Sequence, residues 1–112
     1  MKKVPIKLIE LSEHGYLQIR PDVSVSGDFK SIYRDASGIT WNETNQALVA
    51  SDPDRWEPNK LFGQIICAAI NEYGVKLEIT DSTNWSTNIS EVLKASLLKN
   101  AVDAYTMMRA LN

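Results

Sequence analysis

A change of hydrophobic period at Gly74 limits the possible folds of this chain more than any other feature of the sequence. Before it, residues 59–73 carry apolar side chains every three or four positions, which predicts a helix with one apolar face. After it, apolar and polar residues alternate through residues 75–80, which predicts a strand with one face in the core. Glycine is typical of the position just after a helix, so we expect the helix to begin near Asn59 and to end directly before this strand.

The first half of the chain favours short strands. Leu17 and Ile19 alternate with polar residues, whereas the alternation in residues 6–11 changes phase, which indicates a bulge or a strand buried on both faces. Short connections between the strands favour antiparallel pairing, with one hairpin turn at residues 12–15 and another at residues 35–38. The candidate strands are residues 6–11, 16–20 with a continuation at residues 23–25, 29–34 and 39–41, and residues 47–50 form a weaker fifth candidate.

The longest expected element is a helix over residues 89–111, opened by Asn88 and Glu91 as a variant of the capping box. Its apolar positions spread over about half of the helix circumference at 100° per residue, more than one contact with a sheet requires. One explanation is that the helix packs on both the sheet and the first helix. The other is that the surplus apolar surface forms a homodimer interface, for which the candidate residues are Leu98, Val102 and Tyr105.

These elements predict one α+β domain over residues 1–112, in the order β-β-β-β-(β)-α-β-α. The simplest architecture is an antiparallel sheet of about five strands with both helices packed on one face. A chain of 112 residues buries enough surface to fold without a metal or a disulfide.

The charge balance bears on the class of partner. The chain has 12 basic and 14 acidic side chains, a net charge of −2 without a basic cluster, so we expect no nucleic-acid partner. No apolar run reaches 18 residues, and charged residues interrupt the N-terminal segment, so we expect neither a membrane span nor a signal peptide. The expected location is the cytoplasm.

Candidates for catalysis are few. His14 is the only histidine and lies in a predicted turn, while Cys67 is the only cysteine and lies in the apolar face of a predicted helix. One histidine and one cysteine cannot form a closed metal site, and no glycine-rich phosphate loop is present. The sequence therefore predicts a non-enzymatic protein without metal or cofactor.

Two tryptophans and a group of acidic residues are the strongest candidates for a binding surface. Residues 41–58 carry four acidic side chains against one arginine, and an exposed tryptophan among carboxylates is typical of a surface that binds a basic protein partner. The alternative is that Trp41 and Trp56 cover the open end of the core while the acids keep the loop hydrated. The candidate residues for partner binding are Trp41, Asp52, Asp54, Arg55, Trp56 and Glu57.

The segment of residues 39–79 combines Ile39–Asn42, Trp56–Pro58, a helix, and a strand opened by Gly74. In this it resembles small bacterial proteins encoded on mobile gene cassettes of the integron type, and some immunity proteins of polymorphic toxin systems. The resemblance implies a bacterial cytoplasmic accessory protein that acts by binding, and it carries over no catalytic residue.

Three functions are therefore open at this point. The leading hypothesis is a protein-binding module that uses the acidic segment, with an immunity-type protein as one form of it. The second is a homodimeric accessory protein assembled through the C-terminal helix, and the third is a small-ligand-binding protein or a cryptic enzyme with a pocket between sheet and helices.

Overall fold

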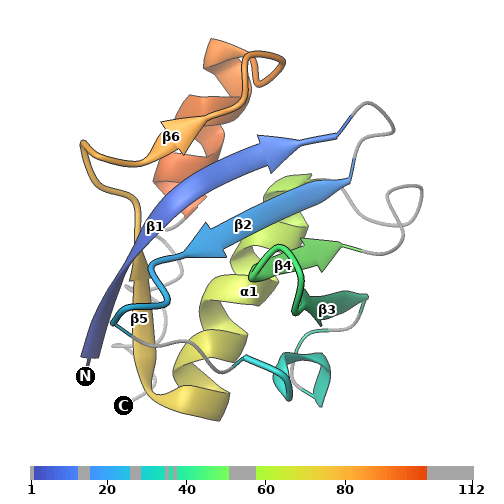
Figure 1. Ribbon diagram of the computed structural model, residues 1–112. Coiled ribbons are helices and arrows are strands. Elements are labelled where there is room, and N and C mark those ends of the chain that lie inside the picture. The colour runs from blue at the N-terminus through green and yellow to red at the C-terminus, as the bar shows by residue number, and fades with distance from the viewer. Residues whose placement is uncertain are drawn as a thin grey trace.

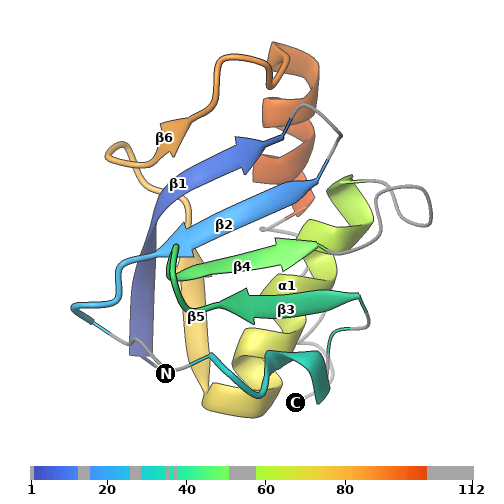
Figure 2. The same ribbon diagram turned by 45° about the vertical axis from the view of Figure 1, so that its right-hand side comes forward.

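A computed structural model of the protein describes residues 2–12, 16–25, 29–34, 36, 38–50 and 58–100. Six strands form one sheet, and two helices lie behind it (Figures 1 and 2). The predicted α+β class and the placement of both helices on one face are confirmed. The elements are β1 (Lys2–Leu11), β2 (Leu17–Pro21), a short 3-10 helix η1 (Ile32–Arg34), β3 (Ile39–Asn42), β4 (Ala47–Ala50), α1 (Pro58–Tyr73), β5 (Val75–Glu78), β6 (Asn84–Trp85) and a second helix at residues 91–100.

The sheet has the strand order β3-β4-β2-β1-β5, and β6 also pairs with β1. The pairs β1–β2, β2–β4 and β3–β4 are antiparallel, as predicted, but β5 and β6 both run parallel to β1. An entirely antiparallel sheet was therefore the wrong expectation. The reason is that α1 acts as a crossover from β4 to β5, and a helical crossover returns the chain to the same end of the sheet.

The phase change in the first strand is a β-bulge. Val4, Ile6 and Ile9 are fully buried, so the buried set moves from even to odd positions between residues 6 and 9. The pairing with β2 shifts at the same point, between Ile6 and Leu8. The extra residue is Lys7, and because of it Lys7 and Leu8 both line the same face of the sheet.

The edge of the sheet beyond β1 is interrupted between β5 and β6. From the pair Pro5–Glu78 to the pair Leu8–Asn84, this edge contains three more residues than β1 does. Thr83 fills the interruption with its side chain: its Oγ1 donates a buried hydrogen bond of 2.6 Å to the Ile6 carbonyl and accepts one of 2.9 Å from the Thr80 N–H. A hydroxyl group thus takes the place of a backbone ladder bond.

The segment after β6 extends this edge in the same way. The Ser86 Oγ accepts a hydrogen bond of 3.0 Å from the Leu11 N–H, and the Asn88 side chain donates one to the Leu11 carbonyl. The Asn88 side chain therefore bonds to β1 and does not cap the helix, contrary to its predicted role. The helix is capped by Ser90, whose Oγ accepts a hydrogen bond of 3.1 Å from the Leu93 N–H.

Two predicted strands in the first half are turns. Residues 29–34 form a turn and η1, because Phe29, Ile32 and Ala36 bury their side chains at the spacing of a helical turn. Residues 23–25 form a turn closed by a hydrogen bond of 3.0 Å from the Val25 N–H to the Asp22 carbonyl. Consequently β3 forms its hairpin with β4 instead of with residues 29–34.

The two helices pack on the core and on each other. α1 runs from Pro58 to Tyr73, close to the predicted bounds, and Gly74 follows with a positive φ of 65°. From the second helix, Leu97 is fully buried and belongs to the same core cluster as the apolar face of α1. The Asn100 side chain donates a hydrogen bond to the Asn59 carbonyl, which connects the two helices. Because α1 already begins at Pro58 and the Asn59 Oδ1 has no partner among the described residues, Asn59 is not the predicted N-cap. The part of the predicted helix beyond residue 100 lies outside the described residues.

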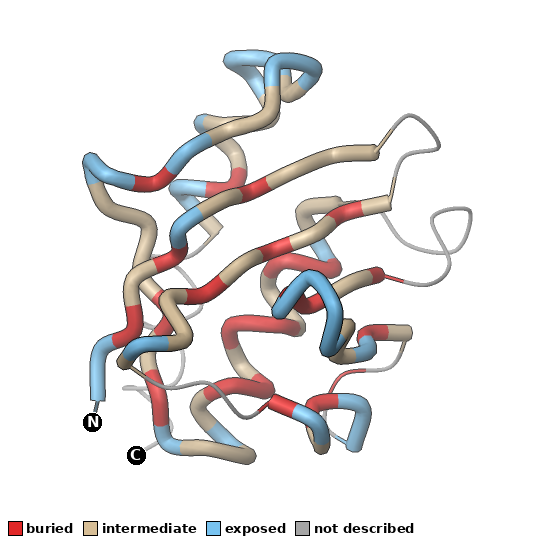
Figure 3. Tube along the Cα trace, viewed as in Figure 1, coloured by how far each residue is buried: buried red, intermediate tan, exposed pale blue. Residues whose placement is uncertain are grey.

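The regular elements are more deeply buried than the turns (Figure 3). The buried residues are concentrated on α1 and on the strands, whereas the turn between β3 and β4 and the segment around residues 81–84 are mostly exposed. Neither helix in the described part of the chain has both the length and the apolar character needed to cross a bilayer.

A basic groove on the uncovered face of the sheet

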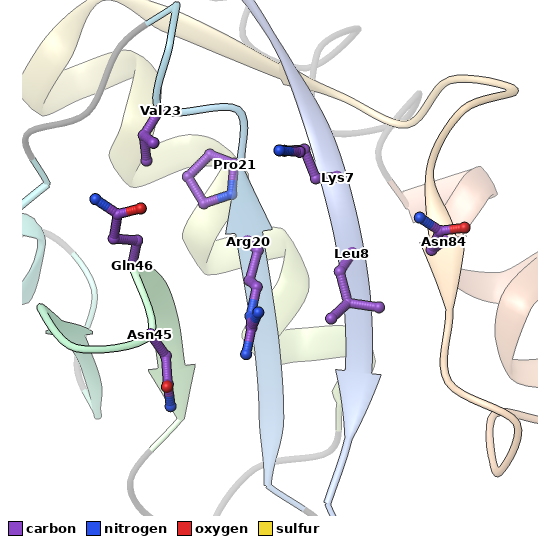
Figure 4. Close-up of a pocket in the computed structure, with 8 residues that line it drawn as sticks. All are labelled: Lys7, Leu8, Arg20, Pro21, Val23, Asn45, Gln46 and Asn84. Carbon is purple, nitrogen blue, oxygen red and sulfur yellow. The ribbon is translucent and has the colours of Figure 1, made fainter.

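A groove with a volume of about 310 Å³ lies on the sheet face opposite the helices (Figure 4). We call it the basic groove. It crosses the sheet from the turn between β3 and β4 to β6, and Arg20 lies along β2 between Leu8 and Asn45 (Figure 4). The lining residues are Lys7, Leu8, Arg20, Pro21, Val23, Asn45, Gln46 and Asn84.

The groove concentrates positive charge on a chain of net charge −2. Lys7 and Arg20 line it, and no acidic residue does so among those that the structure describes. Within the same described residues, neither cation has a carboxylate within 4.0 Å. The Arg20 Nε is moreover buried without a hydrogen-bond partner in the described part of the chain. Among the described residues, two cationic side chains thus line the groove without an ion pair.

One carboxylate lies close to the groove without lining it. Asp22 follows Pro21, and hydrogen bonds from the Ser24 side chain and backbone lower the pKa of Asp22. The charge of Lys7 contributes least to this lowering. Ser24, and not Lys7, is therefore the principal partner of the Asp22 carboxylate.

Three amide side chains add further polar groups to the groove. Asn45 and Gln46 come from the turn between β3 and β4, where the Asn45 N–H donates a hydrogen bond of 3.0 Å to the Asn42 Oδ1 and Gln46 has a φ of 51°. A left-handed residue at the end of such a turn is common in hairpins, so this conformation follows from the connection. Asn84 comes from β6 on the other side of β1.

The groove combines polar and apolar side chains. Its described lining supplies cationic and amide hydrogen-bond donors beside the apolar side chains of Leu8, Pro21 and Val23. Cys67 lies elsewhere, half-buried on α1, and burial raises the pKa of its thiol. A raised pKa keeps the thiol protonated and unreactive at neutral pH. In the described residues no group of three or more His, Cys, Asp or Glu side chains is placed to hold a metal ion.

A second pocket, of about 290 Å³, lies between the segment of residues 79–85 and the second helix. Its charges are mixed, since Asp81 and Lys94 both line it, and the Lys94 Nζ lies 5.2 Å from the centre of the Trp85 ring. Leu98 contributes an apolar wall. Unlike in the basic groove, the lysine here already has an aromatic partner.

Of the predicted partner-binding residues, the structure describes Trp41 alone. Trp41 is half-buried on β3 and packs against the core, with its ring centre 5.4 Å from that of Phe29. This position agrees with the alternative in which Trp41 covers the core. The residues Asp52, Asp54, Arg55, Trp56 and Glu57 lie outside the described residues, as does His14.

Of the predicted dimer residues, the structure describes Leu98, which is 41 % exposed on the second helix. Val92 on the same helix is 81 % exposed. Val102 and Tyr105 lie outside the described residues. The helix therefore carries some apolar surface that the described part of the chain does not cover.

The sequence alone does not predict the basic groove. One signal was present, because the alternation that buries Leu17 and Ile19 places Arg20 on the opposite face. The bulge at Lys7 and the pairing of β6 with β1, which bring Lys7 and Asn84 to that face, depend on contacts between distant segments. No pattern within either segment predicts them.

Comparisons with known proteins agree with the resemblance noted in the sequence. The profile of the family described as Integron Cassette Protein Hfx_Cass5 matches residues 5–83. A solved structure of Integron Cassette Protein Hfx_Cass5, from the mobile metagenome of North West Arm Sewage Outfall, is 32 % identical. The match covers 91 % of this chain and 98 % of the other, with a TM-score of 0.41. No curated protein matches the chain. From the extent of the family match, this chain belongs to the Hfx_Cass5 family of integron cassette proteins.

Proposed function

We propose that this cassette protein is a non-enzymatic binding protein of the bacterial cytoplasm, and that the basic groove is its ligand-binding surface. The observation that carries the proposal is the pair of cations on the uncovered face, with the Arg20 Nε buried and unbonded among the described residues. A buried donor without a partner destabilises a fold by about 1–3 kcal/mol. Because that Nε has almost no accessible area, a ligand in the groove would meet the charge and the terminal N–H groups of the guanidinium and not the Nε itself.

The dimensions of the groove support the same proposal. Its volume of about 310 Å³ is at the lower end of the range of about 300–1,000 Å³ for small-molecule sites. The lining mixes a few convergent polar groups with apolar walls, as such sites usually do.

The test is a binding screen by nuclear magnetic resonance on the ¹⁵N-labelled protein. A fragment set of neutral, acidic and basic compounds is expected to shift amide signals of β1, β2 and the turn between β3 and β4. Arg20→Ala should weaken these interactions at least tenfold, or about 1.4 kcal/mol. The fragments should remain chemically unchanged over a day, because the protein binds without catalysis.

A matched control for this screen is Lys60→Ala, which removes an exposed cation from α1 on the other layer of the fold. It should leave every fragment affinity unchanged. The proposal would be wrong if shifts appeared at the second pocket alone, or nowhere on the uncovered face. Chemical turnover of any fragment would contradict its non-enzymatic part.

The homodimer is a second candidate, favoured by the exposure of Val92 and Leu98 on one helix. At 100° per residue these two side chains point about 120° apart, so Leu98, which is one of the predicted dimer residues, is the one to test. If the protein dimerises through this helix, Leu98→Glu should give the monomer mass in light scattering while the far-ultraviolet circular dichroism stays unchanged. A native chain that is already monomeric at millimolar concentration would rule the dimer out.

A further inference from the structure

We infer that the ligand of the basic groove is a small organic oxyanion, a carboxylate or a phosphate monoester attached to an apolar body. This inference rests on the proposed function, because it assigns a chemical class to the ligand of that same groove. It follows from the signs, the geometry and the apolar surroundings of the groove.

The charged side chains that line the groove all have the same sign. The two ionisable groups that line the groove are both cationic, and neither has a carboxylate within 4.0 Å among the described residues. In the same part of the chain, Lys3, Lys30, Arg34 and Lys76 each have such a carboxylate, whereas Lys2, Lys60, Lys94 and Lys99 have none but do not line the groove. Unpaired cations in one hollow favour an anion and oppose a cation.

The donor geometry adds specificity to the charge. The Arg20 side chain runs along β2 between Leu8 and Asn45 (Figure 4), partly buried with its Nε shielded from solvent. A guanidinium presents parallel N–H groups that match the two oxygens of a carboxylate or phosphate. Asn45 and Gln46 supply amide N–H groups from the neighbouring turn, and Lys7 lies on the other strand beside β2 (Figure 4).

The apolar lining indicates that the anion is not bare. Leu8, Pro21 and Val23 line the same groove as the two cations. Contact with apolar carbon is favourable only for a ligand that carries an apolar part of its own. A volume of about 310 Å³ limits that part to a small group such as one ring or a short chain.

The test compares probes of one shape and different charge, titrated against the ¹⁵N-labelled full chain at pH 7. Benzoate is expected to bind at least tenfold more tightly than benzamide, its neutral isostere. Raising the salt concentration from 20 to 200 mM should weaken benzoate and leave benzamide unchanged, because salt screens exposed charges. Phenyl phosphate is the third probe: tighter binding than benzoate would assign a phosphate monoester, and weaker binding a carboxylate.

Three variants test whether the preference for benzoate over benzamide comes from the side chains of the groove. Arg20→Gln should reduce the benzoate affinity at least tenfold, to about that of benzamide, and Lys7→Gln should reduce it about threefold. Lys60→Gln, which neutralises an exposed cation on α1, should change it by less than twofold. Lys7 is exposed, so Lys7→Gln tests the inference even if Arg20→Gln fails to fold.

Failure of the oxyanion inference and failure of the proposed function give different results. If benzamide binds the groove as tightly as benzoate, or if Lys60→Gln acts as strongly as Arg20→Gln, the oxyanion inference is overturned while the binding function stands. If no probe of any charge shifts the amide signals of the groove, the proposed function itself falls.

Discussion

Phe29→Ala should lower the free energy of unfolding by about 3–5 kcal/mol, the usual range when a buried phenylalanine is truncated. Phe29 is fully buried, and its ring centre lies 5.4 Å from that of Trp41 and 5.2 Å from that of Tyr73. It thereby connects the turn before η1 to both β3 and the end of α1. Urea denaturation followed by circular dichroism measures the loss.

The matched control is Tyr33→Ala, since Tyr33 lies in η1 close to Phe29 in sequence but is 59 % exposed. We expect it to change the free energy by less than about 0.5 kcal/mol, as exposed substitutions usually do. Phe29→Leu should fall between the two, because it keeps part of the buried volume. Equal losses from Phe29→Ala and Tyr33→Ala would show that residues 29–34 are not packed as described.

Thr83→Val should lower the free energy of unfolding by about 2–4 kcal/mol. The substitution removes one hydroxyl group that makes hydrogen bonds to two backbone groups. The Ile6 carbonyl and the Thr80 N–H would lose bonds of 2.6 and 2.9 Å, and Thr83 itself is only 7 % exposed. The buried Ile6 carbonyl would cost about 1–3 kcal/mol without its partner, and the part-buried Thr80 N–H adds less because water can reach it. Valine has nearly the same shape, so the effect belongs to the hydroxyl and not to packing.

Two companion variants isolate that cause. Thr83→Ser keeps the hydroxyl and should retain most of the stability, whereas Thr40→Val on the exposed face of β3 should have almost no effect. Hydrogen exchange adds local evidence, because the Thr80 amide should exchange faster in Thr83→Val and at the native rate in Thr83→Ser. A valine variant as stable as the serine variant would argue against this role of Thr83.

The sequence predicted those parts of the fold that depend on local periodicity. The helix before Gly74 and the strand after it follow from the spacing of apolar residues, whereas the change of phase in the first strand left a bulge and a strand buried on both faces as alternatives. The direction of β5 did not follow, since alternation shows which face of a strand is buried and not which neighbour it pairs with. Residues 29–34 were mistaken for a strand because their buried positions are few and their three-residue spacing is short.

The candidate site was harder to predict than the fold. Along the sequence, acidic side chains cluster in the segment around Trp56, and such a cluster predicts a basic partner. The basic groove is assembled from residues far apart in sequence, such as Lys7 and Asn84, and it predicts a ligand of the opposite sign. Such a site becomes visible only when strand order and register are known.

The position of β1 has a consequence for synthesis of the protein. β1 is translated before the residues that complete its outer edge, since Thr83 lies 77 positions after Ile6. Until those residues leave the ribosome, β1 presents an unsatisfied edge of the kind that pairs with other chains. Such late closure over a long sequence distance slows folding, so a newly made chain passes through a period in which it is open to aggregation.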